Sequence, residues 1–194
     1  MKKITKRLFD ILFSVVALVV LSPLLGVIAL FIKLSDKGPV IFKHERAGKD
    51  AKPFVFFKFR TMKVHVDPYD QSPGSGDDPR LIKGGKFLRE YSLDELPQFF
   101  NVLKGDMSIV GPRPLYLSQI RDFTAVHKKR FLLKPGITGL SQIYLRSELT
   151  STESLDLEVR YVDRHSFWLD MKIIFRTIYV VLTKKGVYQK GSKQ

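Results

Sequence analysis

The stretch LVVLSPLLGVIAL, from Leu18 to Leu30, is apolar enough to lie in a membrane, yet it carries the pair Ser22-Pro23 at its centre. Proline has no backbone N–H and its ring clashes with the carbonyl four residues earlier, so a helix kinks or breaks there. Two structures fit this pattern. One is a kinked helix that spans the membrane, and the other is a helical hairpin that enters and leaves through the same face.

The apolar run around this pair is long. Residues from Ile11 to Ile32 carry no charge, and as a helix they would measure roughly 33 Å, against about 30 Å for the hydrocarbon core of a bilayer. The run is too long for the apolar part of a secretory signal peptide, and no small-x-small cleavage site follows it. A single spanning helix is therefore possible, because membrane helices tolerate proline.

The charges beside the run favour the hairpin. A spanning helix should carry more Lys and Arg on its cytoplasmic side, whereas both flanks are basic here. In a hairpin broken at Ser22-Pro23 both flanks share one face, and each arm reaches roughly half the depth of the core. The proline frees the carbonyl of Val19, and the Ser22 hydroxyl is placed to bond carbonyls of the preceding turn. The residues alone leave both structures open. The flanking cations are Lys2, Lys3, Lys6 and Arg7 before the run, and Lys33, Lys37, Lys43, Arg46 and Lys49 after it.

Composition limits the classes of function. The chain has 194 residues, which suits one domain and a membrane element. Lys and Arg outnumber Asp and Glu by 33 to 19, a formal net charge of +14, which implies an anionic partner such as nucleic acid, an acidic membrane surface or a phosphorylated substrate. There is no cysteine, which excludes disulfides, thiolate metal sites and a cysteine nucleophile.

The soluble part begins with two β-rich runs, Val40–Lys43 and Phe54–Phe59, which flank the turn-like segment RAGKDAKP and predict a β-hairpin. Further on, Ser92 and Glu95 form a capping-box pattern that predicts a helix over Leu93–Lys104. The other expected elements are a rigid turn at GPRP (Gly111–Pro114), a helix over about Leu115–Leu133, a turn at KPGITG (Lys134–Gly139) and a C-terminal helix within SFWLDMKIIFRTIYVVLTKKG (residues 166–186).

The C-terminal helix has apolar residues at helical spacing. Arg176 interrupts its apolar face, which argues against a second membrane span. With Trp168 at one end and Lys184-Lys185 at the other, the helix suits a membrane interface. An ordinary core-facing helix fits the pattern equally well.

Asp94 and Glu95 are adjacent acids at a predicted helix start. Acids are common there, because they cap the helix and interact with its dipole. However, Arg89 precedes the pair by about one turn and Arg113 follows soon after. Two carboxylates among arginines are typical of a site for a divalent metal ion and phosphates.

Other candidate residues are weaker. Lys58 and Arg60 alternate with phenylalanines on a predicted strand and are either a phosphate-facing row or the solvent face of that strand. The pair Asp77-Asp78 resembles metal-binding acids, but it lies in a polar loop. A membrane-tethered nucleic-acid-binding module is an alternative that would explain the charge. The basic residues are spread along the chain rather than clustered on one helix, so no nucleic-acid partner is expected.

Taken together, the motifs resemble those of bacterial sugar transferases, the small monotopic phosphoglycosyl transferases that act on polyprenyl phosphates. The similarity runs through almost the whole chain, is most specific from Leu93 to Pro114, and is closest to the minimal members. The matching pieces are KRLFD, the central SP, GPVIFKHERAGKDAKPFVFFKFRTM, LREYSLDELPQFFNVLKGDMSIVGPRP, KPGITGLSQI and YVDRHSFWLDMKIIFRT.

The resemblance implies an α+β fold. A re-entrant, helix-break-helix membrane hairpin (residues 1–36) precedes a small mixed α/β catalytic domain (residues 37–194) with interfacial amphipathic helices. It implies a monotopic protein of the bacterial inner membrane, in contact with membrane lipids, whose catalytic domain is on the cytoplasmic face. The implied reaction moves a sugar-1-phosphate from a UDP-sugar to a polyprenyl phosphate, normally undecaprenyl phosphate, and releases UMP as the first membrane step of glycoconjugate assembly.

The resemblance also assigns residues. Asp94 matches the family nucleophile and Glu95 its acidic partner, with Mg²⁺ at Asp94. Asp170 matches a late family acid, and Glu158 stands where the family has an aspartate. Because carboxylates can act as nucleophiles, we expect a ping-pong mechanism through an aspartyl-phosphosugar. The expected substrate-binding residues are Lys58, Arg60, Arg89, Arg113 and Arg146.

Overall fold

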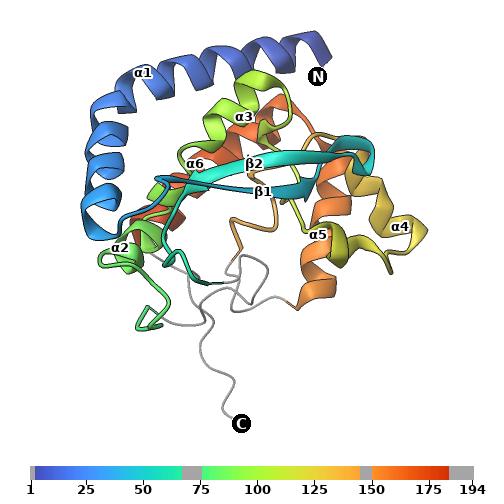
Figure 1. The fold of residues 1–194 in the computed structure, drawn as a ribbon. Coiled ribbons are helices and arrows are strands. Elements are labelled where there is room, and N and C mark those ends of the chain that lie inside the picture. The colour runs from blue at the N-terminus through green and yellow to red at the C-terminus, as the bar shows by residue number, and fades with distance from the viewer. Residues whose placement is uncertain (1–2, 67–75, 145–149, 184–194) are drawn as a thin grey trace.

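Helix α1 (Lys3–Ser35) is one continuous helix with a sharp bend, so that its two arms point in different directions (Figure 1). Pro23 lies inside it and deprives the Val19 carbonyl of its helical donor. The Ser22 hydroxyl donates to that carbonyl over 2.8 Å, which confirms the expected compensation. The break predicted from the sequence is therefore a bend, and the two arms do not fold back against each other.

The rest of the chain mixes short helices with two small sheets, in agreement with the expected α+β class. The computed structural model describes residues 3–66, 76–144 and 150–183. The elements after α1 are β1 (Ile41–Ala47), the 3-10 helix η1 (Lys49–Ala51), β2 (Pro53–Phe59), α2 (Gly85–Glu90), the 3-10 helix η2 (Leu93–Glu95), α3 (Gln98–Lys104), β3 (Ser108–Val110), the 3-10 helix η3 (Leu117–Ile120), α4 (Ala125–Lys128), the 3-10 helix η4 (Lys129–Leu132), β4 (Gly136–Thr138), α5 (Ser151–Arg164) and α6 (Phe167–Thr183).

The first arm of α1 is held against this domain by polar contacts. Arg7 donates to the carbonyls of Val102 and Leu103 at the end of α3, over 2.5 and 2.7 Å. The Asp10 carboxylate accepts a hydrogen bond from the Ser108 hydroxyl over 2.9 Å. These groups satisfy C-terminal helix carbonyls and a buried acid, so the arm is fixed at a defined place.

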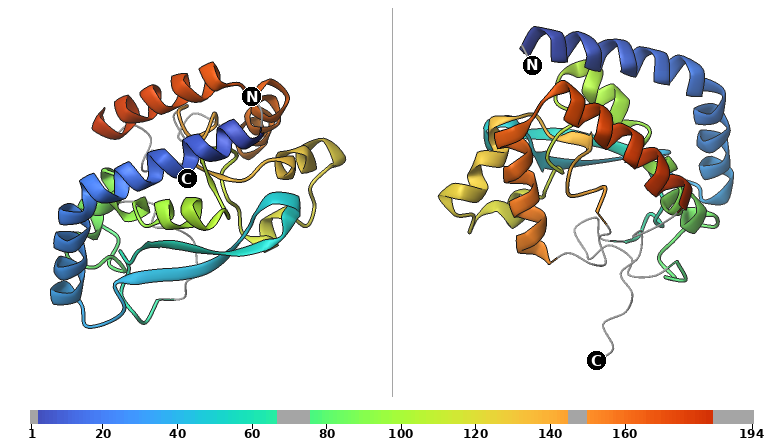
Figure 2. Two further views of the ribbon diagram at one scale, coloured as in Figure 1. Left: turned by 90° about the horizontal axis from the view of Figure 1, so that it is seen from above. Right: turned by 180° about the vertical axis from the view of Figure 1, so that it is seen from behind.

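Asp170, the late acid of α6, belongs to the same contact. It is buried, accepts from the Tyr161 hydroxyl over 2.7 Å and forms an ion pair of 3.1 Å with Lys6. Close to it, the rings of Phe9 and Phe167 meet with centroids 6.1 Å apart, at the point where the N-terminal ends of α1 and α6 lie together (Figure 2). Asp170 therefore joins α1, α5 and α6.

The second arm of α1 is held by apolar packing. Ile28 and Ile32 are buried against Phe59, Ile82 and Leu88. Both arms of α1 thus contact the same domain, one through charged groups and the other through side chains of the core.

The predicted β-hairpin is confirmed. Strands β1 and β2 pair antiparallel, with Ile41 opposite Phe59 and Ala47 opposite Pro53. The side chain of Asn101 on α3 fixes this hairpin, because it accepts from one backbone N–H of β2 and donates to one of its carbonyls, over 3.0 and 2.6 Å.

The second sheet was not predicted. Strands β3 and β4 form a parallel pair, and β4 occupies the KPGITG segment that the sequence assigns to a turn. The backbones of these two segments approach each other so closely that a Cβ on Gly136 would lie 2.1 Å from the backbone nitrogen of Gly111. Only glycine fits at such a contact.

The helices of the second half differ from the prediction. The single helix expected over Leu115–Leu133 is wrong, because the chain forms only the short pieces η3, α4 and η4 there. Helix α5 was missed, although Thr150 and Glu153 make a reciprocal capping box at its start. Helix α6 lies where the C-terminal helix was expected.

Two helices expose large apolar side chains. By length and composition alone, α1 could cross a membrane. On α6, Trp168 is 80% exposed and Phe175 is 71% exposed. Exposed apolar faces of this size mark contact with a partner or a membrane. The other exposed apolar residues of these helices include Leu8, Leu12, Val16, Val19, Val20, Val27, Leu30 and Leu34 on α1, and Ile178 and Leu182 on α6.

Candidate active site

Asp94 lies in the short helix η2, between α2 and α3, and its side chain is buried, with 5% of the residue exposed. Ser92, immediately before η2, has a φ of 53°. Residues other than glycine rarely adopt this left-handed conformation, and strained backbone of this kind clusters at functional sites. The turn therefore directs a carboxylate into the protein just after a strained residue.

The capping box predicted at this turn is wrong. In the structure Ser92 makes no capping hydrogen bond with its side chain, and α3 begins only at Gln98. The end of the helix is as expected, with Gly105 in the left-handed conformation. Glu95 is thus not engaged in capping, which was the ordinary explanation for its presence, and it remains half-buried beside Asp94.

Three charged side chains act on Asp94. The pKa of Asp94 is raised to about 6: burial is the main cause, Lys58 of β2 and Arg89 of α2 lower this pKa, and the adjacent Glu95 adds to the rise. The pKa of Lys58 is itself lowered by burial, an effect that the Asp94 carboxylate opposes. Three of the predicted residues, from β2, α2 and η2, therefore surround the predicted nucleophile.

Arg46 is a further cation of this site, and the sequence indicated it only as part of the basic flank after the apolar run. Its guanidinium carbon lies 3.2 Å from the centre of the Tyr116 ring. Burial lowers the pKa of Arg46 to about 10; Tyr116 opposes this shift, Arg113 adds to it, and Glu95 opposes it. Arg46 thus links the acid pair to the predicted GPRP turn, which is non-helical as expected.

The GPRP turn contacts a buried ion pair. Arg130 of η4 is 2% exposed and forms an ion pair of 2.5 Å with Glu158 of α5. It also donates to the carbonyl of Arg113, and the Ser141 hydroxyl donates to Glu158 over 2.9 Å. The Glu158 carboxylate thus stabilises the position of Arg130, which in turn holds the GPRP turn.

Arg60 is placed elsewhere. It is 4% exposed and donates to the side chain and carbonyl of Asp36 and to the carbonyl of Pro39. These bonds fix the link between α1 and β1, which gives Arg60 a structural role. Its predicted role in substrate binding stays a prediction.

The remaining predicted features are Arg146 and the pair Asp77-Asp78. Arg146 lies outside the described residues. Asp77 pairs with Lys86 over 3.3 Å, and hydrogen bonds from Arg80 lower the pKa of Asp78 to about 2. Both acids of this loop are therefore engaged with cations of their own neighbourhood.

The acid pair fits a magnesium ion by its chemistry. Mg²⁺ binds through one or two carboxylates and completes its shell with water and substrate phosphates. Within the described part of the chain there is no group of three or more His, Cys, Asp or Glu that could form an all-protein cage. Asp94, with Glu95 next to it, could supply the one or two oxygen ligands that such a site needs, and a cation there would offset the repulsion between the two acids.

Known proteins are similar in sequence to this chain. A family model described as bacterial sugar transferase matches residues 1–184. The chain is 45% identical, over 94% of its length, to a UDP-glucose:undecaprenyl-phosphate glucose-1-phosphate transferase of Klebsiella pneumoniae, and 37% identical, over 93%, to a UDP-N-acetylgalactosamine-undecaprenyl-phosphate N-acetylgalactosaminephosphotransferase of Aeromonas hydrophila. It is also 42% identical, over 96%, to the uncharacterized sugar transferase EpsL of Bacillus subtilis (strain 168).

The coverage of these relatives differs. The chain spans 41% of the Klebsiella protein and 44% of the Aeromonas protein, but 91% of EpsL. The match to the family model over nearly the whole chain, together with the buried acid and the cations around it, supports one conclusion: the chain belongs to the bacterial sugar transferase family.

Proposed function

We propose that this chain transfers a sugar-1-phosphate from a UDP-sugar to a polyprenyl phosphate, undecaprenyl phosphate in particular, and releases UMP. The observation that carries the proposal is the burial of Asp94 among Lys58, Arg89 and Glu95. The names of the relatives support both substrates, because two of them name an undecaprenyl-phosphate acceptor and a UDP-sugar.

The proposed reaction has two steps. A carboxylate oxygen of Asp94 attacks the phosphorus that carries the sugar, the bond from that phosphorus to the bridging oxygen breaks, and UMP leaves with the electron pair. An oxygen of the polyprenyl phosphate then attacks the same phosphorus and breaks its bond to Asp94, which frees the carboxylate. Each step exchanges one P–O bond for another, so no oxidant, reductant or additional group is needed.

The cations have defined tasks in this scheme. Lys58 and Arg89 offset the repulsion between the Asp94 carboxylate and an incoming diphosphate. Arg46, which interacts with both Glu95 and Arg113, and Arg113 would bind phosphate oxygens, for which the planar guanidinium is well suited. A Mg²⁺ ion bound at Asp94 would supply further neutralisation of phosphate charge.

The same acids allow a one-step reaction, in which they would deprotonate the lipid phosphate for direct displacement. A phosphate monoester is already an anion at neutral pH and needs little help from a base. The buried carboxylate of Asp94 is better used as a nucleophile, with Glu95 orienting groups beside it.

We also propose that α1 is re-entrant, so that both its ends lie with the catalytic domain on the cytoplasmic face of the cell membrane. Arg7 in the first arm and Ile32 in the second both contact this domain. A straight spanning helix would place its first residues across the membrane from the domain they contact. The bend at Pro23 and the basic flanks support the same placement.

Isotope exchange without the lipid acceptor tests the mechanism. The enzyme is incubated with Mg²⁺, a UDP-sugar and labelled UMP. Label should enter the UDP-sugar, and a sugar-phosphate adduct should be found by mass spectrometry on the peptide that carries Asp94. Asp94→Asn should abolish both, Glu95→Gln should leave some adduct, and the exposed-site control Asp122→Asn should behave as wild type.

One result would exclude the two-step reaction. If exchange and adduct are both missing while turnover with the lipid is fast, substrates react directly in a ternary complex. If no UDP-sugar supports UMP release in the presence of polyprenyl phosphate, the proposed activity itself is wrong.

A further inference from the structure

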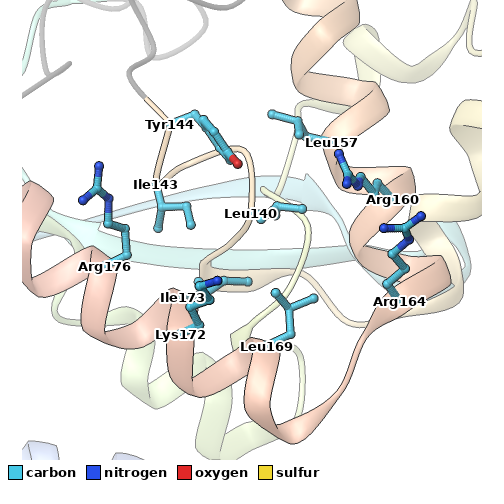
Figure 3. A pocket seen from close by; sticks show the side chains of 10 residues that line it. All are labelled: Leu140, Ile143, Tyr144, Leu157, Arg160, Arg164, Leu169, Lys172, Ile173 and Arg176. Atoms are coloured by element: carbon cyan, nitrogen blue, oxygen red, sulfur yellow. The ribbon is translucent and has the colours of Figure 1, made fainter.

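A hollow of about 540 Å³ lies between α5, α6 and the segment after β4 (Figure 3). Its floor is apolar and includes Leu140, Ile143, Leu157 and Ile173. This volume is within the range typical of small-molecule sites. Asp94, Glu95, Lys58, Arg89 and Arg113 are not among its lining residues, so it is distinct from the candidate active site.

The rim of the hollow is cationic. Arg160 and Arg164 come from α5, and Lys172 and Arg176 from α6. All four side chains are exposed, and none of the described residues that line the hollow is acidic. The salt bridges found within residues 3–66, 76–144 and 150–183 involve none of these four cations.

Two of the cations repel each other. Arg160 and Arg164 are one turn apart on α5, and their guanidinium groups lie side by side on one wall (Figure 3). Like charges at this spacing destabilise a helix. An anion held between them would remove this repulsion and receive charge-assisted hydrogen bonds from both.

The position of the hollow on α6 indicates where that anion comes from. Lys172 and Arg176 form one strip of α6, next to the exposed apolar face that includes Trp168 and Phe175. When that face rests on a membrane, the strip beside it lies at the level of the lipid headgroups, and long cationic side chains reach that level readily.

We propose that this hollow binds one anionic glycerophospholipid of the membrane. The phosphate lies between Arg160 and Arg164, Lys172 and Arg176 close the charged rim, and the first part of an acyl chain covers the floor at Leu157 and Ile143. The inference rests on the membrane placement proposed above, but not on the phosphosugar transfer. The bound lipid would anchor α5 and α6 to the membrane at a fixed depth.

Lipid retention by the full chain tests this proposal. The protein is purified in detergent micelles that contain equal amounts of phosphatidylglycerol and phosphatidylcholine with the same acyl chains, and retained lipid is counted by native mass spectrometry. Wild type should retain one phosphatidylglycerol. Arg160→Gln with Arg164→Gln should lower this retention about tenfold, as expected for the loss of charge-assisted bonds.

A charge-matched control distinguishes the effect of the cations of the hollow on lipid retention from the effect of the overall positive charge. Arg121→Gln with Lys128→Gln removes two exposed cations elsewhere and should leave retention unchanged. Equal retention of both lipids by wild type, equal loss in the two double variants, or no loss in the Arg160 and Arg164 variant would each overturn the proposal.

Two further measurements identify the ligand without relying on activity. Asp94→Asn should retain phosphatidylglycerol as wild type does, because no turnover is involved. Millimolar inorganic phosphate and an equal amount of polyprenyl phosphate should not displace it. Displacement by phosphate would mean a simple anion site, and displacement by polyprenyl phosphate would mean an acceptor site, and either result would refute a phospholipid site.

Discussion

The backbone N–H of Arg113 donates a hydrogen bond of 3.1 Å to the carboxylate of Glu158. Glu158 is buried, and burial raises the pKa of its carboxyl, while the Arg130 guanidinium lowers this pKa. The turn that carries a proposed phosphate-binding residue is thus attached to α5 by a buried acid.

Replacing Glu158 should therefore destabilise the fold. Glu158→Gln keeps an acceptor for Arg113 but leaves Arg130 as an unpaired buried charge, a change that typically costs about 3–5 kcal/mol. We expect a lower midpoint in chemical denaturation of the detergent-solubilised protein. The double variant Arg130→Met with Glu158→Gln removes both charges and should regain most of the loss; a double variant no more stable than Glu158→Gln would contradict the ion-pair explanation.

Arg113 itself is expected to act through the geometry of its guanidinium. Arg113→Lys keeps the charge but loses the planar pair of donors. Turnover should fall about tenfold or more, as for the loss of a charge-assisted hydrogen bond to phosphate, while the unfolding midpoint stays the same. The matched control is Arg121→Lys, at an exposed position, which should be fully active. Turnover of Arg113→Lys close to wild type would remove Arg113 from the substrate site.

The raised pKa of Asp94 predicts a pH-dependent stability. Its value is about 6 in the folded chain against an ordinary 3.8, so the folded state holds the proton more tightly than the unfolded state, and stability falls as the pH rises between these values. Asp94→Asn cannot ionise. In metal-free buffer it should match wild type near pH 4 and exceed its free energy of unfolding above pH 6, by on the order of 3 kcal/mol.

Thermal unfolding with a chelator, from pH 4 to pH 8, provides the measurement. The two proteins should diverge through the pH window between the two pKa values. A constant difference across the whole range would mean that Asp94 does not titrate there, and so that its burial does not disfavour its charge.

The proposed topology of α1 is open to labelling. The chain has no cysteine, so Lys3→Cys and Lys37→Cys give single reporters at the two ends of α1, and Lys128→Cys reports the side of the catalytic domain. An impermeant thiol reagent should label all three from the cytoplasmic side only. Labelling of Lys3→Cys from the opposite side would establish a spanning helix.

Pro23→Ala tests the cause of that topology. Alanine restores the hydrogen bond to the Val19 carbonyl and favours a straight helix. Combined with the Lys3→Cys reporter, it should shift part of the population towards labelling from the opposite side. A distribution equal to that of the parent reporter would show that the contacts of Arg7 and Asp10 with the domain hold the bend without the proline.

The sequence by itself determined the features that follow from local rules. The bend in α1 follows from the missing N–H of Pro23, and its compensation from the short reach of the Ser22 hydroxyl to the preceding turn. The β1–β2 hairpin and helix α6 follow from alternation and helical spacing of apolar residues. The acid pair was visible because its residue types are unusual beside arginines.

Only the tertiary structure decided which of these residues meet. Arg60 and Lys58 are two residues apart on the chain, yet Arg60 closes the link after α1 while Lys58 faces Asp94. The parallel pairing of β3 with β4, and the attachment of Arg113 to Glu158, join segments distant in sequence. Such contacts depend on how the core packs, and the local backbone preferences that a sequence expresses do not specify them.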